Sequence, residues 1–96
     1  MAKSFQWHAA KAIANLAKHG VSFQEASTVF KNPLAVVLVD EKHSQTEFRE
    51  IIVGDSGSGR LLVVSFTERN QAIRIISART ATRRERSKYE GQANRE

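Results

Sequence analysis

The chain has 96 residues and no cysteine, which leaves room for one small domain and excludes both a disulfide framework and a thiolate metal site. Its longest apolar runs, LAVVLV and LLVVSF, are far shorter than the roughly 18 residues of a membrane-spanning helix. No apolar signal segment follows Lys3. We therefore expect one domain over residues 1–96, in a reducing compartment such as the cytoplasm.

The positive charge is concentrated in the last third of the chain. Residues 1–59 carry six Lys or Arg and six Asp or Glu, whereas residues 60–96 carry nine and four, so the whole net charge of +5 lies there. Eight of these nine bases are arginine, whose planar guanidinium binds phosphate in a bidentate manner. The pattern favours a polyanionic partner such as nucleic acid, although a solubilising basic helix would give the same charge.

The first third predicts an edge strand, SFQW, followed by two helices. From Ala9 apolar residues recur at helical spacing, which predicts a stripe that packs on the rest of the fold. Gly20 is expected to end this helix in a left-handed conformation. Ser22 and Glu25 have the spacing of a capping box, and the second helix should end at Asn32-Pro33. The predicted stripe of the first helix consists of Ala9, Ala12, Ile13, Leu16 and Ala17.

Four strands are predicted next. LAVVLVD is continuously apolar, which indicates burial on both faces. TEFREIIVG alternates, and places Glu47 and Arg49 on the face of Ile51 and Val53. DSGSG and RNQ read as turns on either side of a central strand, RLLVVSFTE.

The last strand, AIRIISAR, leads into a basic helix. Alternation predicts that Arg79 shares a face with Ile73 and Ile75, together with Ser77, and that Arg74 faces the other way. Thr82 and Glu85 form a second capping-box pattern, and the tail from about residue 91 is expected to fray. The predicted fold is therefore α+β, with helices packed on an antiparallel meander and a basic helix at the C-terminus.

No metal or cofactor motif is present. GDSGSG lacks the lysine and the following helix of a phosphate-binding loop, so we interpret it as a hairpin turn. His8, His19 and His43 do not fall at metal-ligand spacing. We expect neither a metal site nor a cofactor.

Titratable groups at the ends of the predicted elements offer one chemistry. Metal-free RNA cleavage needs a base for the 2′-OH, cations for the phosphorane and an acid for the leaving 5′-oxygen. The candidate catalytic residues are Lys18, His19, Glu47, Arg49, Arg79 and Tyr89, and the candidate RNA-binding residues are Arg74, Arg83 and Arg86.

Each candidate also has a simpler structural explanation. Lys18 and His19 suit the last turn of a helix as cations, and Glu47 with Arg49 could form an exposed pair. A salt bridge is a common fate for an arginine placed like Arg79, and the ring of Tyr89 could simply cover its helix. A module that binds nucleic acid or a partner without catalysis is therefore the alternative hypothesis.

Four blocks of the sequence resemble the BrnT family of toxins from bacterial toxin–antitoxin pairs. The resemblance runs from about Phe5 to Glu90, and the blocks are FQWHAAKAIANLAKHGVSFQEASTVF, HSQTEFRE, GRLLVVSFTER and IRIISARTATRRERSKYE. It implies a RelE-like ribonuclease fold, with a helical pair on a curved antiparallel sheet. It also implies a metal-independent endoribonuclease that arrests growth by cutting RNA, and a BrnA-like antitoxin whose ribbon-helix-helix part binds the operon's DNA.

The resemblance assigns the family's motif residues to positions of this chain. They are Lys18 and His19 in KHG, Glu47 and Arg49 in EFR, Arg79 in SAR and Tyr89 in YE. One departure is that the family has Trp-Asp where this chain has Trp7-His8. Histidine is a weaker helix cap than aspartate, which leaves open how the first helix begins.

Overall fold

Residues 4–43 and 47–93 are described by the computed structural model. The strands form one sheet in the order β1-β5-β4-β3-β2, in which β2 to β5 make the predicted antiparallel meander and β1 joins β5 in parallel. The helices are α1 (Ala9–His19), α2 (Phe23–Thr28) and α3 (Arg83–Ala93), with short 3-10 helices η1 (Val29–Lys31) and η2 (Glu41–His43). The strands are β1 (Ser4–Gln6), β2 (Val36–Val39), β3 (Glu50–Asp55), β4 (Leu61–Arg69) and β5 (Ala72–Thr80).

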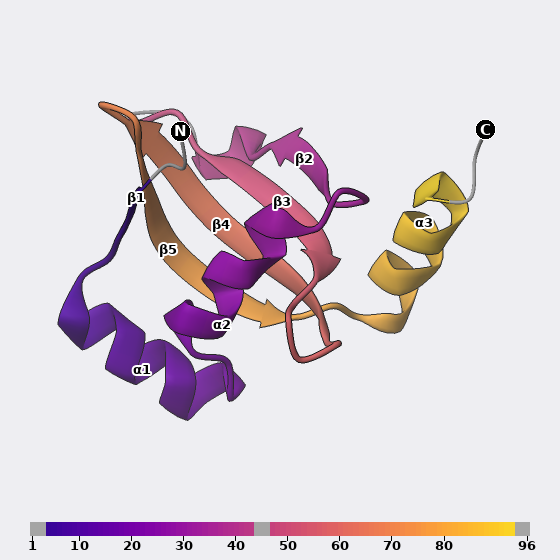
Figure 1. Ribbon diagram of the computed structural model, residues 1–96, viewed down its shortest axis with the longest axis horizontal. Coiled ribbons are helices and arrows are strands. Elements are labelled where there is room, and N and C mark those ends of the chain that lie inside the picture. Colours follow the sequence, from indigo (N-terminus) through magenta and orange to yellow (C-terminus); the bar gives the residue numbers. More distant parts are fainter. Residues whose placement is uncertain (1–3, 44–46, 94–96) are drawn as a thin grey trace.

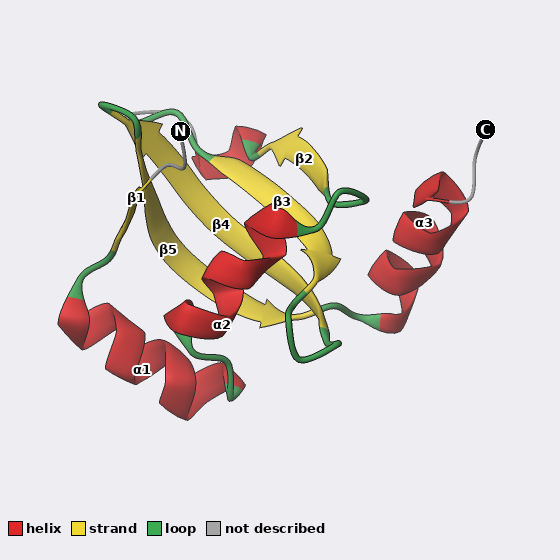
Figure 2. Cartoon of the chain, in the orientation of Figure 1, coloured by secondary structure: helices red, strands yellow, loops and turns green. Residues whose placement is uncertain are grey.

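The two N-terminal helices lie on one face of the sheet, and α3 lies apart from them (Figures 1 and 2). Apolar side chains of α2 and the segments beside it, Val21, Phe23, Ala26 and Val29, are fully buried against the sheet. On the sheet side the same core contains Ile52, Leu62, Val64, Phe66, Ile73, Ile75 and Ala78. We refer to the sheet face away from α1 and α2 as the open face.

Aromatic edge-to-face contacts attach the edge strand β1 to this core. The ring of Phe30 lies 5.3 Å from that of Phe5 and 4.9 Å from that of Phe66, between centroids. Trp7 meets Phe23 at 5.9 Å. Each pair has the steep interplanar angle that aromatic quadrupoles favour, so three residues of strand suffice to hold β1 in place.

Most of the apolar stripe predicted for α1 does not face the core, which corrects the sequence-based prediction; of the five predicted residues, only Ala12 packs against the core. Ile13 and Leu16 are 72% and 51% exposed, and Ala9 and Ala17 are exposed as well. The buried residue of the helix is Asn15, with 7% exposure. The helix is therefore rotated so that a polar side chain points inward and its largest apolar side chains point outward.

Hydrogen bonds from Asn15 explain this rotation. Its Oδ1 accepts from the backbone N–H of Ala78 (3.1 Å), and its Nδ2 donates to the carbonyl of Ala78 (2.8 Å) and to that of Val21 (2.9 Å). Strand β1 pairs with β5 only as far as Arg74, so the outer edge of β5 at Ala78 has no strand beside it in the described part of the chain. The amide of Asn15 supplies the donor and acceptor that a neighbouring strand would have supplied.

Two strand predictions also need correction. Strand β2 was expected to be buried on both faces, but it is one of the two edge strands of the sheet, and Val37, Leu38 and Val39 are each about half exposed. Strand β3 begins only at Glu50, so Glu47 and Arg49 precede the strand. A strand is buried on both faces only where other layers of the fold cover both faces of the sheet, and the sequence does not reveal where in the sheet the strand lies.

A β-bulge reverses the predicted facing of the end of β5. Ser77 pairs with Ser65 and Ile75 with Phe66, which leaves Ile76 as one extra residue on β5. Before the bulge Ile75 points into the core, and after it Ala78 does. Arg79 therefore lies on the open face with Arg74, and not on the face of Ile73 and Ile75 as predicted. Side chains alternate between the two faces of a strand, and one extra residue exchanges the faces of all residues that follow it.

The predicted caps and turns are confirmed. Gly20 is left-handed (φ 69°) and donates to Leu16, the Oγ of Ser22 accepts from the N–H of Glu25 at 3.0 Å, and α1 begins at Ala9 without a capping bond from His8. At the β4–β5 turn Asn70 and Gln71 both have positive φ (52° and 66°), as a two-residue hairpin of the primed type requires. Helix α3 continues to Ala93, and residues 94–96, the rest of the tail expected to fray, lie outside the described residues.

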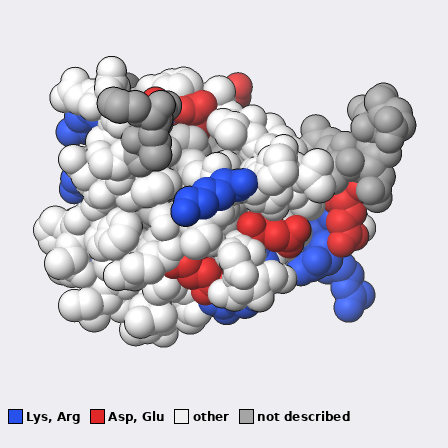
Figure 3. Space-filling view, in the orientation of Figure 1, with Lys and Arg blue, Asp and Glu red and all other residues white. Residues whose placement is uncertain are grey.

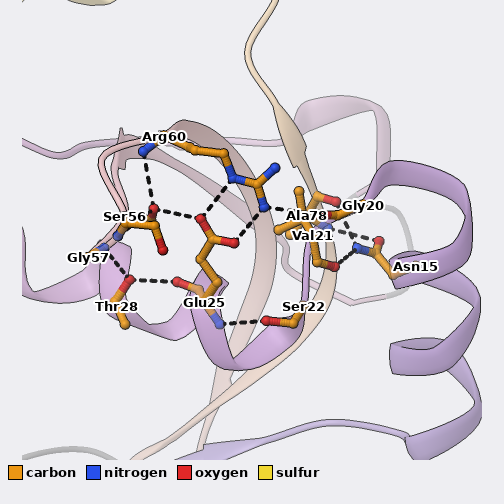
Figure 4. A network of polar contacts seen from close by, with 11 residues as sticks. Asn15, Gly20, Val21, Ser22, Glu25, Thr28, Ser56, Gly57, Arg60 and Ala78 are labelled. Carbon is orange, nitrogen blue, oxygen red and sulfur yellow. Dashed lines mark hydrogen bonds and ion pairs between the residues drawn. The ribbon is translucent and has the colours of Figure 1, made fainter.

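A polar network joins α2 to the β3–β4 turn (Figure 4). The carboxylate of Glu25 accepts from Arg60 through Nε (3.0 Å) and Nη2 (2.5 Å) and from the hydroxyl of Ser56 (2.7 Å). Arg60 also donates to the carbonyl of Gly20 at 3.0 Å. The hydrogen bonds from Arg60 lower the pKa of Glu25. The capping box of α2 is therefore half formed, because the Glu25 side chain serves the turn instead of the backbone N–H of Ser22.

We predict that Asn15→Ala lowers the free energy of unfolding by about 2–4 kcal/mol, because it leaves buried backbone groups of Ala78 and Val21 unpaired. Asn15→Leu should be destabilising too, although leucine is the more apolar residue. Ile13→Ala, on the exposed side of the same helix, should change stability by less than about 0.5 kcal/mol. Urea unfolding followed by circular dichroism measures all three. A leucine variant as stable as the parent would contradict the role given to the amide.

Candidate functional site

A cleft lies between the open face of the sheet and α3. Its volume is about 620 Å³. Its floor is aliphatic and comes from β2, β3 and β4, and its rim is polar and comes from the end of β5 and from α3. The lining residues are Val36, Leu38, Ile51, Val53, Val63, Arg79, Glu85, Ser87, Lys88, Tyr89 and Gly91. An apolar floor with a few polar groups at the rim is the usual composition of a ligand-binding site.

Arg79 and Glu85 form a bidentate ion pair at the rim of this cleft. Nη1 and Nη2 of Arg79 each lie 2.8 Å from one carboxylate oxygen of Glu85. The hydrogen bonds from Arg79 lower the pKa of Glu85 to about 2, and the pair raises that of Arg79. The arginine side chain is still 41% exposed, so a ligand in the cleft can reach it.

Glu85 also completes the capping box of α3. Its Oε1 accepts from the backbone N–H of Thr82 at 2.9 Å, and its own N–H donates to the Thr82 hydroxyl at 3.2 Å. The predicted reciprocal pair is therefore confirmed, and the same carboxylate holds Arg79. One residue sets both where α3 begins and where the guanidinium points.

Tyr89 is the residue through which α3 packs on the sheet. It is 6% exposed, and its hydroxyl is buried without a hydrogen-bond partner among the described residues. Burial and the nearby Asp55 carboxylate raise the pKa of the phenol, which therefore stays protonated at neutral pH. Contact between this hydroxyl and a substrate would require α3 to move.

Three further candidates gather at the opposite end of the sheet, around Thr67. Arg74 is paired with Thr67 across β4 and β5, and the Thr67 hydroxyl donates to the carbonyl of Phe48 at 2.7 Å, which ties the segment holding Glu47 and Arg49 to β4. Glu47 forms an ion pair with Arg69. Arg69 is a partner of Glu47 that the sequence did not suggest.

The remaining candidates lie on the two outer helices. Lys18 and His19 form the last turn of α1, on the helix-covered side of the sheet and away from the cleft. Arg83 and Arg86 are exposed on α3, and Arg86 approaches Glu90 at 3.6 Å. Of the six candidate catalytic residues, the structure brings Arg79 and Tyr89 into one cleft, Glu47 and Arg49 to the far end of the sheet, and Lys18 and His19 to α1.

Among residues 4–43 and 47–93, no three His, Asp or Glu side chains are arranged so that they could hold a metal ion. Within the same ranges, none of the helices has the length and apolar character needed to cross a membrane.

The architecture and the cleft define a small α+β protein whose open sheet face carries Arg74 and Arg79 beside an aliphatic floor. The family model described as "Ribonuclease toxin, BrnT, of type II toxin-antitoxin system" matches residues 7–85. The chain therefore belongs to the BrnT family of ribonuclease toxins. The match includes Arg79 and Glu85 and ends before Tyr89, so most of α3 lies outside it.

A solved structure with a similar fold is the 1.1 Å crystal structure of the Brucella abortus ribonuclease toxin BrnT. The TM-score is 0.66 at 23% sequence identity, over 84% of this chain and 99% of that chain. The two proteins share the fold at this level of identity. No curated protein sequence matches the chain.

The depressed pKa of Glu85 predicts an acid-sensitive α3. The pKa is about 2 in the folded protein against a usual 4.5, so the ionised carboxylate stabilises the fold above pH 4.5, and this contribution is lost as the pH falls toward 2. Glu85→Gln keeps a capping acceptor but cannot titrate. The difference in stability between parent and variant should therefore shrink between about pH 4.5 and pH 2, as measured by unfolding at each pH. A constant difference would contradict the ionised pair.

Proposed function

We propose that this chain is a metal-independent endoribonuclease that cleaves RNA by attack of the 2′-OH, leaves a 2′,3′-cyclic phosphate and arrests growth. Its fold is related to that of RelE-like ribonucleases, and it acts in the cytoplasm. A BrnA-like antitoxin, with a ribbon-helix-helix part that binds operator DNA, neutralises it. The membership in a family of ribonuclease toxins of type II toxin–antitoxin systems supports this proposal.

The observation that carries the proposal is the placement of Arg74 and Arg79 on one face of the sheet. Arg74, which precedes the bulge at Ile76, and Arg79, which follows it, both lie on the open face, and α3 borders this face at the cleft. Arg83 and Arg86 on α3 extend the positive surface beyond the rim of the cleft. Together they form a track for the phosphates of a single strand, while the apolar floor accommodates bases that are not stacked.

Arg79 is the residue that we propose to stabilise the phosphorane. Its fork already binds two oxygens of the Glu85 carboxylate at equal distances, and a phosphate presents two oxygens in the same way. An incoming phosphate would therefore replace Glu85 at the guanidinium without any change in the donor geometry. The developing charge of the phosphorane would then bind more strongly than the ground-state phosphate.

Proton transfer needs a base and an acid from the remaining candidates. Glu47 and His19 are the groups whose chemistry suits a base, and Tyr89 with its raised pKa suits an acid. Arg49 and Lys18 would contribute positive charge. Because these side chains lie at separate places in the structure, bound RNA has to bridge them or α3 has to move.

The first expected result is cleavage of labelled RNA by the purified protein in EDTA, with fragments that end in a 2′,3′-cyclic phosphate. The measurement is gel analysis of the ends, with and without phosphatase and acid treatment. Fragments with a 3′-hydroxyl, or activity that returns only with added magnesium, would contradict this mechanism. Binding without any cleavage would support the non-catalytic alternative.

The second expected result concerns Arg79. Arg79→Ala should slow cleavage by a hundredfold or more, the equivalent of roughly 3 kcal/mol, because the phosphorane loses a charged bidentate donor. Arg84→Ala is the matched control, since it removes an exposed arginine outside the cleft, and it should change the rate little. Single-turnover rates with saturating protein provide the comparison.

A second variant separates catalysis from structure. If Arg79 acts only by holding α3 through Glu85, then Glu85→Gln should lose as much activity as Arg79→Ala. If Arg79 binds phosphate, Glu85→Gln should keep the activity, because the competing carboxylate charge has been removed.

A further inference from the structure

The outward side of α1 is an uncovered apolar face. Six residues of this helix are both apolar and exposed: Ala9, Ala10, Ile13, Ala14, Leu16 and Ala17. In Figure 3 the molecule is almost uniformly uncharged over the region of α1, at the lower left. Single exposed apolar residues are ordinary, but a contiguous face of this kind is typical of a surface that binds another protein.

The fold itself turns this face outward. A rotation of α1 about its axis would bury Ile13 and Leu16, but it would break the three bonds that join Asn15 to Val21 and to β5. Those bonds fix the rotation, so the exposed face is as well defined as the core. Its outline is therefore preformed, which lowers the entropic cost of binding a partner.

The charges beside the face indicate what kind of partner binds there. The charged residues of α1 are Lys11 and Lys18, both exposed, and His19 follows in its last turn; the helix contains no acidic residue. At 3.6 residues per turn Lys11 and Lys18 lie almost directly above one another, along one border of the apolar face. A complementary surface therefore combines an apolar stripe with a row of carboxylates along one flank.

We propose that this face binds an amphipathic α-helix of the antitoxin, with acidic residues along the flank that meets Lys11 and Lys18. The identity of the partner rests on the function proposed above. Alanines at positions 10, 14 and 17 allow the two helix axes to approach closely, and Ile13 and Leu16 form the ridge that enters the groove of the partner helix. The surface is separate from the cleft, because α1 and α3 lie on different sides of the sheet.

A second copy of this chain fits the face less well. An antiparallel pair of α1 helices that set Ile13 against Leu16 of the other copy would also set Lys11 against Lys18 twice. Like charges at such positions oppose pairing. The same lysines favour an acidic partner.

The test is calorimetry of the chain with the full-length antitoxin of its own operon. Ile13→Gln combined with Leu16→Gln should weaken binding by about tenfold or more, since two apolar anchors leave the interface. Lys11→Glu should weaken it less at high salt than at low salt. Leu34→Gln is the matched control, because Leu34 is 59% exposed and lies between η1 and β2, outside α1, and it should leave the affinity unchanged.

Cleavage of RNA without antitoxin is measured on the same proteins and should be unchanged in the glutamine double variant. Unchanged antitoxin affinity in that variant would overturn the inference. A parent chain that is dimeric by sedimentation equilibrium, and that becomes monomeric in the double variant, would assign the face to self-association and overturn it as well. If the parent chain does not bind the antitoxin, the proposed partner is wrong and this inference fails with it, while the RNA assay still decides the nuclease function independently.

Discussion

The amide of Asn15 is the contact on which the arrangement of the N-terminal half depends. A buried side-chain amide needs several partners, and here both a backbone N–H and two backbone carbonyls meet it. It occupies the free edge of β5 where β1 has already ended, and so closes the sheet with a side chain instead of a strand. Because these bonds are directional, they fix the rotation of α1, which the apolar contacts of alanines could not do.

The bulge in β5 determines side-chain direction on the open face of the sheet, as Asn15 determines the rotation of α1. With strict alternation the guanidinium of Arg79 would enter the core beside Ile75, where an arginine is tolerated only with a buried partner. The extra residue at Ile76 places Ala78 in the core instead and directs Arg79 to the open face. Bulges commonly redirect side chains in this way next to functional sites. The ion pair with Glu85 then holds the redirected guanidinium at the rim of the cleft.

Most local features of the fold could be predicted from the sequence. The end of α1 at Gly20, both Ser/Thr caps, the two hairpin turns and the central position of β4 all follow from residue types with strong local preferences. Asn32-Pro33 ends the 3-10 helix η1, whereas α2 itself already ends at Thr28. Features that depend on strand order were not predictable, such as the exposure of β2. The rotation of α1 and the bulge were also missed, since each depends on contacts between distant segments.

In the candidate site, too, local features could be predicted and contacts between distant segments could not. The candidate Arg79 lines the cleft, but its predicted facing was wrong because no residue type marks a bulge of this kind. Glu85 was recognised as a cap and not as the partner of Arg79, although its place one turn into α3 brings it back toward the end of β5. The pairing of Glu47 with Arg69 joins residues far apart in the chain, and no local pattern could have indicated it.

Both surfaces of the molecule are linked through two adjacent residues of β5. Ala78 is bound through its N–H and its carbonyl to Asn15 of α1, and the next residue, Arg79, is bound through its side chain to Glu85 of α3. A displacement of α1 along the sheet edge would therefore move the backbone from which the Arg79 side chain extends. The Asn15 hydrogen bonds and the bidentate ion pair between Arg79 and Glu85 both depend on direction, so neither tolerates a small shift of the backbone well. A partner on α1 and a substrate at Arg79 would thus act on the same short segment of strand from opposite faces of the sheet.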